Sequence, residues 1–236
     1  MRKKPLLEIV HLLLLLSTFI VGCALQTPTQ PSAFPLNKGT TWVYSYEAYE
    51  QTASDPTQII KATYQLTETV AGTENVSTYF VAHVKREHKL IDADAGWAQD
   101  FSSEPHEFWY IVNDHQVLQS NLPLDNANIN IDELRLDYDF PLSVKKSRCL
   151  FSVNAKSPKR PISCEVVGRR EVTSQGPYET SAGKFDNCYD MIDYWNPGNF
   201  FQKFCTGVGI VSMKFDHAGT KFGFEQTLIR YFAGVQ

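Results

Sequence analysis

The stretch Thr41–Tyr49, "TWVYSYEAY", decides the fold class of this chain. Trp42, Tyr44 and Tyr46 occupy every second position of it. Successive side chains of an extended strand point to opposite faces, so these three rings share one face. The stretch therefore predicts a β-strand that turns an aromatic face toward a core.

The same period of two recurs along the chain, whereas helical periodicity is almost absent. Ile60, Ala62, Tyr64 and Leu66 alternate with polar residues in the next such run. The remaining strand candidates are Ser77–Glu87, Glu107–Val112, Val117–Gln119, Glu165–Thr173, Lys184–Trp195, Phe200–Cys205, Gly209–Phe215 and Glu225–Phe232.

Turn sequences at Asn113–Gln116 and Asn196–Asn199 separate neighbouring runs. The one helix candidate is Ile131–Asp137, "IDELRLD". We predict an all-β chain of about ten strands. The strands are expected to form a single curved, mostly antiparallel sheet, an open or half barrel, with little helix.

An internal similarity links two distant segments. "FPLNKGTTW" at Phe34–Trp42 resembles "FPLSVKKSR" at Phe140–Arg148, and each precedes a predicted strand. The second copy departs from the first, with Lys145 in place of glycine and arginine in place of tryptophan. Two interpretations stay open: two similar β halves, 34–139 and 140–236, or a chance repeat of Phe-Pro-Leu.

The N-terminus has the features of an export signal. Basic residues at positions 2 to 4 precede the apolar run Leu12–Val21. As a helix this run would be about 15 Å long, too short for a membrane core of about 30 Å. It ends in Ile20-Val21-Gly22-Cys23, which resembles the lipobox of bacterial lipoproteins. We predict a cleaved signal peptide, 1–22, rather than a transmembrane anchor.

In bacterial lipoproteins the lipobox cysteine carries a diacylglyceryl group and often a further acyl chain such as palmitate. The resemblance implies this modification of Cys23. It would anchor the chain to the extracytoplasmic face of a bacterial membrane, either inner or outer. The alternative is an ordinary secretory signal with an incidental cysteine.

The segment after Cys23 is polar, contains proline and lacks charge. Such a composition predicts a flexible tether, 23–33, before the β domain, 34–236. Without residues 1–22 the chain has 19 basic and 25 acidic residues, a net charge of −6. This charge argues against a nucleic-acid partner.

Four further cysteines remain, at positions 149, 164, 188 and 205. An even number in an exported chain predicts disulfides, and local spacing favours Cys149–Cys164 and Cys188–Cys205. The alternative is four reduced structural cysteines.

The second pair also depends on the register of a hairpin. If Trp195–Gly198 forms the loop, Tyr194 opposes Asn199, and Cys188 lies directly opposite Cys205. If Asn196–Asn199 forms the turn instead, the two cysteines are diagonal neighbours, near the distance limit for a disulfide.

The glycines of Phe204–Val211, "FCTGVGIV", could suggest a phosphate-binding loop. Such loops follow a strand and open a helix, yet Gly207 and Gly209 precede another strand-like alternation. We therefore predict structural glycines that bend a strand and bind no cofactor.

Metal and catalytic motifs are weak. Asp92–Gly96 only partly matches a calcium loop, because its twelfth position is Ser103 instead of glutamate. The acidic segment Leu124–Asp139 is better explained as a solvated loop, and the histidines lack metal-binding spacing. We predict a non-enzymatic protein without metal or cofactor.

Three C-terminal segments carry a family resemblance: Thr180–Met191, "TSAGKFDNCYDM", Gly207–Phe215, "GVGIVSMKF", and Gly223–Tyr231, "GFEQTLIRY". With the opening Pro35–Trp42, they resemble a set of bacterial envelope lipoproteins with an "AGxF…GVGxV" pattern. That set is similar to the open β-barrel lipoproteins typified by the lipoprotein-localisation carriers and the mycobacterial lipid-binding lipoproteins. The resemblance implies a curved sheet around an apolar cavity for acyl chains, and it transfers no catalytic residue.

The expected function follows from these features. We expect an envelope lipoprotein, anchored through Cys23, that binds a hydrophobic ligand or another envelope component on its curved sheet. One alternative is an interaction module with a filled core and no ligand. Another is an anchored secreted hydrolase.

Overall fold

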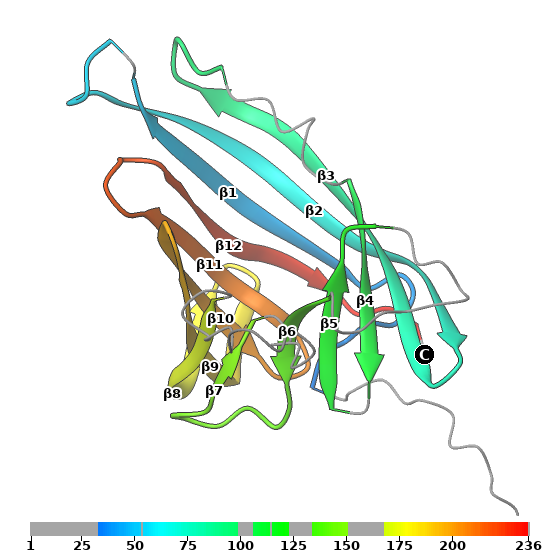
Figure 1. The fold of residues 1–236 in the computed structure, drawn as a ribbon. Helices are drawn as coiled ribbons and strands as arrows, with labels where there is room; N and C mark the ends of the chain where they lie inside the picture. Colours follow the sequence, from blue (N-terminus) through cyan, green and yellow to red (C-terminus); the bar gives the residue numbers. More distant parts are fainter. Residues whose placement is uncertain are drawn as a thin grey trace, which may run out of the picture.

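The computed structural model describes residues 33–52, 54–98, 106–113, 115–122, 134–150 and 168–235. These residues form twelve strands and no helix, all in one sheet (Figure 1). The expected all-β class and single curved antiparallel sheet are confirmed, with twelve strands rather than about ten.

Each strand pairs antiparallel with its neighbours in the sheet order β6-β5-β4-β3-β2-β1-β12-β11-β10-β9-β8-β7. The strands are β1 (Thr41–Gln51), β2 (Ile59–Val76), β3 (Tyr79–Ala93), β4 (Glu107–Asn113), β5 (Gln116–Ser120), β6 (Arg135–Asp139), β7 (Ser147–Cys149), β8 (Arg169–Thr180), β9 (Gly183–Trp195), β10 (Gly198–Cys205), β11 (Gly209–His217) and β12 (Gly223–Phe232).

The sheet curves until its two edge strands approach each other (Figure 1). The backbone N–H of Leu136 in β6 donates a hydrogen bond of 2.7 Å to the carbonyl of Leu150, just beyond β7. Across the same seam, Arg148 Nε donates to Asp139 Oδ2 at 2.7 Å, and Lys146 Nζ lies 3.1 Å from that oxygen. The sheet is therefore nearly closed, as a barrel rather than a half barrel.

This seam also sets the ionisation of Asp139. Burial alone would raise its pKa, but hydrogen bonds from Arg148 and Lys146 outweigh burial and hold the pKa below its usual range. The carboxylate is charged at neutral pH and faces two cations. These ion pairs link β6 to the segment around β7. Among the described residues, the hydrogen bond from Leu136 to Leu150 is the one backbone–backbone hydrogen bond across this seam.

The aromatic face predicted in β1 lies in the core. Trp42, Tyr44 and Tyr46 are all buried, as the alternation predicted. Trp42 Nε1 donates to the carbonyl of Val208, and the Tyr44 hydroxyl donates to that of Ile210. The two rings thus bury apolar surface and still satisfy their polar atoms.

One end of the barrel is filled by aromatic rings. Phe34 packs against Tyr110, Tyr138 and Phe204, with ring centroids 5.0 to 5.8 Å apart. Tyr138 and Phe204 also contact each other at 4.6 Å. This end of the interior leaves no room for a ligand around Phe34.

The helix candidate Ile131–Asp137 is wrong in its described part, because Arg135–Asp139 forms β6. Its backbone pairs with β5, and this pairing replaces the local bonds of a helix. Residues 131–133 lie outside the described residues.

The two similar segments have the same backbone hydrogen bonds. In the first, Gly39 N–H bonds to Val70 and Thr40 N–H bonds to Asn37. In the second, Lys145 N–H bonds to Val172 and Lys146 N–H bonds to Ser143. Gly39 and Lys145 both have positive φ angles, 87° and 71°. The loop conformation therefore recurs even though the second copy lacks the glycine.

Of the two predicted structural glycines, Gly207 lies in the turn between β10 and β11, and Gly209 is the first residue of β11. Residues 206–208 connect β10 to β11, and Cys205 pairs with Gly209 across the turn. Gly207 and Gly209 have φ angles of 79° and 102°, which side chains rarely adopt. The Gly207 N–H donates to the carbonyl of Ala33, so this amide is already engaged within the protein.

Candidate functional site

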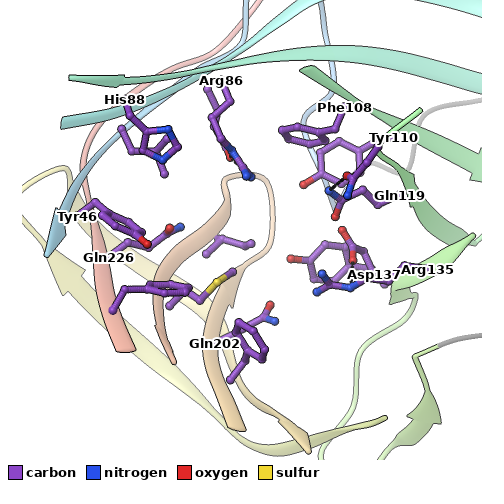
Figure 2. Close-up of a pocket in the computed structure, with 18 of the residues that line it drawn as sticks. Tyr46, Arg86, His88, Phe108, Tyr110, Gln119, Arg135, Asp137, Gln202 and Gln226 are labelled. Atoms are coloured by element: carbon purple, nitrogen blue, oxygen red, sulfur yellow. Dashed lines mark hydrogen bonds and ion pairs between the residues drawn. The ribbon is translucent and has the colours of Figure 1, made fainter. Parts of the chain in front are cut away.

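A cavity of about 300 Å³ lies on the concave side of the sheet, beyond the aromatic end (Figure 2). We call it the central cavity. Residues from both halves of the chain line it: Tyr46, Leu66, Glu68, Arg86, His88, Phe108, Tyr110, Gln119, Asn121, Arg135, Asp137, Tyr138, Arg170, Phe200, Gln202, Ile210, Met213, Phe224 and Gln226.

Strand geometry explains which residues line the cavity. Leu66 and Glu68 in β2, Phe200 and Gln202 in β10, and Phe224 and Gln226 in β12 are each two residues apart. Residues at this spacing face the same side of a sheet. In each of these three pairs one residue is apolar and the other polar, so the cavity has a mixed lining.

The most buried polar group beside the cavity is Asp193 of β9, whose side chain is fully buried. Arg170 Nε and Nη2 donate to its two carboxylate oxygens at 2.5 and 2.6 Å. Gln202 Nε2 donates to Asp193 Oδ2 at 2.8 Å. A bidentate pair of this kind fixes the guanidinium in one orientation. Asp193 therefore positions both Arg170 and Gln202.

These contacts leave two buried atoms without a hydrogen-bond partner among the described residues: Arg170 Nη1 and Gln202 Oε1. Both residues line the cavity and are more than nine-tenths buried. Burial disfavours the charge of Arg170, but Asp193 outweighs burial and raises the pKa further. The guanidinium therefore stays charged, and its remaining N–H groups are available as donors.

A second ion pair on the cavity wall joins Arg135 and Asp137 of β6. Arg135 Nε lies 3.2 Å from Asp137 Oδ1 without hydrogen-bond geometry, so both atoms count as unpartnered within the described chain. Burial raises the pKa of Asp137, and the cations Arg135 and Arg170 only partly oppose this. Figure 2 shows both side chains on the wall opposite Tyr46 and Gln226.

A third ion pair lies where β2 pairs with β3. Arg86 Nε and Nη2 both donate to Glu68 Oε1, at 2.9 and 2.7 Å, and the guanidinium stacks over the Phe108 ring at 4.9 Å. Next to it, burial and the charge of Arg86 lower the pKa of His88 to about 4. His88 is therefore neutral at neutral pH.

The cavity is thus polar but nearly balanced in charge. Its three arginines face three carboxylates: Arg86 lies beside Glu68, Arg170 beside Asp193, and Arg135 beside both Asp137 and Asp193. No group of three metal-ligating side chains is found in the described part of the chain. The lining offers hydrogen-bond donors, acceptors and aromatic rings, which suit binding of a small polar molecule.

The residues singled out in the sequence lie elsewhere. Cys188 and Cys205 form a disulfide and pair directly across β9 and β10, with Tyr194 opposite Asn199. This is the register in which Trp195–Gly198 forms the loop. Neither cysteine lines the cavity.

Cys149 is also disulfide-bonded. Cys164 and the lipidation site Cys23 lie outside the described residues. The Cys149–Cys164 pairing and the lipidation therefore stay predictions.

The sequence analysis missed the cavity residues. A signal was present: Arg86 and His88 continue the inward-facing positions of β3, and Arg170 lies two residues before the core residue Val172. A charged residue at an inward position of a strand is unusual and indicates a buried polar site. The family resemblance implied an apolar cavity, whereas polar and apolar side chains are mixed in the lining of this one.

Within the described ranges, no helix is long and apolar enough to cross a membrane. No model of a known protein family matches this sequence, and no curated protein matches it.

Two solved structures match the chain. One is a protein from Bacteroides fragilis that is inferred to be exported and has a YmcC-like fold. It shares 14% sequence identity at a TM-score of 0.42, over 84% of this chain and 98% of that one. The other is an inferred lipoprotein from Parabacteroides distasonis, with 12% identity, a TM-score of 0.41, and coverage of 84% and 97%. Likeness at this level supports no inference about function.

Proposed function

We propose that this chain is an exported, lipid-anchored envelope protein without enzymatic activity that binds a ligand in the central cavity. The observation that carries the binding proposal is the pair of buried atoms on Arg170 and Gln202 that have no hydrogen-bond partner among the described residues. Buried polar groups in folded proteins are nearly always hydrogen-bonded, and exceptions occur where a ligand or water completes the site.

Export is supported by the N-terminal sequence and by the disulfides. The basic residues, the short apolar run and Cys23 match a lipoprotein signal. The Cys188–Cys205 disulfide fits an oxidising compartment outside the cytoplasm. The ligand is therefore expected to be a component of the cell envelope.

The hydrophobic ligand expected from the sequence needs revision. Aromatic and aliphatic side chains cover part of the wall, but Arg170, Gln202 and Asp137 would remain unsatisfied against an acyl chain. Each buried polar group left without a partner costs about 1–3 kcal/mol. We therefore propose a ligand that presents both polar and apolar surface to the cavity.

Native mass spectrometry of the protein isolated from its own membranes tests this function. Met213 lines the cavity from β11, and its replacement by tryptophan should fill the space. Ser212→Trp is the matched control, because adjacent residues of a strand face opposite sides. We expect a bound small molecule on the wild type and on Ser212→Trp but not on Met213→Trp. Absence of any bound molecule from all three proteins would refute the proposal.

A second candidate is an assembly module that contacts another envelope protein. Ile59 at the start of β2 and Leu90 and Ile91 near the end of β3 are 40%, 53% and 57% exposed. Large apolar side chains left exposed can mark a protein contact. The same mass spectra distinguish the candidates, because an assembly module would retain a protein partner and no small molecule.

A further inference from the structure

We propose that the central cavity binds an uncharged, hydroxyl-bearing ring, a saccharide unit of an envelope glycan. This inference rests on the proposed function, in which the cavity is a ligand site, and it adds the chemical class of the ligand. Four properties of the cavity carry it: a buried donor and a buried acceptor held by the same carboxylate, balanced charge, aromatic rings in the lining and small volume.

The two atoms that lack a partner within the described part of the chain have opposite roles. Asp193 can only accept hydrogen bonds when ionised, so Gln202 must turn its amide nitrogen toward it. The oxygen of Gln202 is then the unpartnered acceptor, and Arg170 Nη1 is the unpartnered donor. Both side chains are held by the same carboxylate. A hydroxyl group donates and accepts at once, so adjacent hydroxyls of one molecule can satisfy both atoms.

The balanced charge argues against an ionic ligand. An anion drawn to Arg170 or Arg135 would also meet Asp137 and Gln202, which line the same cavity. A cation drawn to those oxygens would meet the guanidinium groups. In either case a buried charge would have to be desolvated without a free counter-charge. A neutral polar group avoids this cost.

Aromatic rings provide the apolar part of the site. The lining contains six aromatic rings, those of Tyr46, Phe108, Tyr110, Tyr138, Phe200 and Phe224. A saccharide ring has C–H groups on its faces and hydroxyls around its edge. Its faces can pack on the rings while its edge reaches Gln202 and Gln119. An acyl chain would use only the rings.

The volume sets the size of the ligand. Small-molecule sites usually measure about 300–1,000 Å³, and this cavity lies at the lower limit. It therefore suits one or two saccharide rings, or the end of a longer glycan.

The test uses the full lipidated chain in a zwitterionic detergent, because detergents with sugar head groups belong to the proposed ligand class. The probes are the methyl glycosides of neutral hexoses, 6-deoxyhexoses and N-acetylhexosamines. Disaccharides built from the same sugars are tested alongside them. Glucuronate, glucosamine, oleate, phosphatidylglycerol vesicles and an uncharged dipeptide amide serve as competing classes. Binding is read as a concentration-dependent rise in melting temperature and confirmed by calorimetry.

Gln202→Met keeps the size of the side chain but removes both the acceptor oxygen and the hydrogen bond to Asp193, so a comparison of sugar analogues is needed to separate the two losses. Gln175→Met on the exposed part of β8 is the control for the substitution itself. We expect Gln202→Met to weaken saccharide binding roughly five- to tenfold and Gln175→Met to leave it unchanged. A monodeoxy analogue that lacks the hydroxyl contacting Gln202 should bind the wild type more weakly than the parent sugar does. The Gln202→Met variant should bind the analogue and the parent sugar with equal affinity. A merely structural role for Gln202 would weaken all analogues alike.

The outcomes separate the two proposals. A neutral saccharide that binds wild type with this analogue pattern supports the inference. Binding of oleate, phosphatidylglycerol, a charged sugar or the peptide, without any neutral saccharide, overturns the saccharide inference but leaves a ligand-binding function. Binding of no probe, together with no ligand on the protein from its own membranes, overturns both.

Discussion

Gly207 in the β10–β11 turn and Gly209 at the start of β11 differ in a way that can be measured by replacing each with alanine. Both have positive φ, so either alanine is strained by an amount of about 1 kcal/mol. A Cβ atom at Gly207 would meet nothing within 4 Å. A Cβ atom at Gly209 would lie 2.9 Å from Phe34 Cε2 and 3.4 Å from Trp42 Nε1. Only the second substitution adds a clash.

Neither neighbour of Gly209 can move easily. Phe34 is enclosed by the rings of Tyr110, Tyr138 and Phe204, and Trp42 donates its hydrogen bond to Val208. Forcing an extra atom into a packed core costs about 1–3 kcal/mol. We therefore expect Gly207→Ala to lower the unfolding free energy by about 1 kcal/mol and Gly209→Ala by about 2–4 kcal/mol.

Urea unfolding of the chain from residue 24 onward, followed by tryptophan fluorescence, measures both losses. Phe34→Leu in the Gly209→Ala background provides an internal check, since a smaller neighbour should recover part of the loss in a double-mutant cycle. Equal losses for the two alanine variants, or no coupling with Phe34, would refute the packing argument. A phosphate-binding role would instead leave stability intact and show a nucleotide-dependent rise in wild-type melting temperature.

Four further predictions follow from the sequence and the structure. Cys23→Ser should abolish incorporation of radiolabelled palmitate and release the protein from the membrane fraction, and equal labelling of both proteins would exclude lipidation at this residue. Non-reducing peptide mapping should find Cys149 joined to Cys164 and Cys188 joined to Cys205, and any other linkage in protein from the envelope would contradict the expected pairing. Lys145→Gly should raise the unfolding free energy by about 0.5–1 kcal/mol, because it relieves a side chain at positive φ, whereas Gly39→Lys in the equivalent loop should lower it; calorimetry measures both. The pKa of His88 is lowered to about 4, so between pH 6.5 and 4 the unfolded chain binds a proton that the folded chain does not, and stability should fall over this range. His88→Gln should flatten that part of the stability–pH curve, and an unchanged slope would show that His88 titrates normally.

Much of the local structure could be predicted from period-two alternation. The face formed by Trp42, Tyr44 and Tyr46 is buried as expected. For the β9–β10 hairpin the sequence left two registers open, and the structure contains the one in which Cys188 lies directly opposite Cys205. These features depend on residues close in sequence. Their side chains follow the common rule that apolar residues face inward.

The missed features break that rule or depend on distant residues. In β6, Arg135 and Asp137 face the interior as an ion pair, so the strand carries no hydrophobic alternation and was mistaken for a helix. The charges of the cavity are tolerated because partners from other strands meet them, as Asp193 of β9 meets Arg170 of β8. Pairing of Thr41 with Phe232 has no local sequence signal at all.

The pairing of the first strand with the last has a consequence for the time course of folding. During synthesis the N-terminus emerges first, so β1 can pair with β2 as soon as that hairpin is complete, but its other edge stays open until β12 arrives. An open strand edge invites pairing with other chains, and such non-local pairings form slowly. The interval between β1 and β12 is therefore the period in which this protein is most exposed to aggregation. A chaperone that shields the free edge of β1 would protect the chain until its last strand joins the two halves.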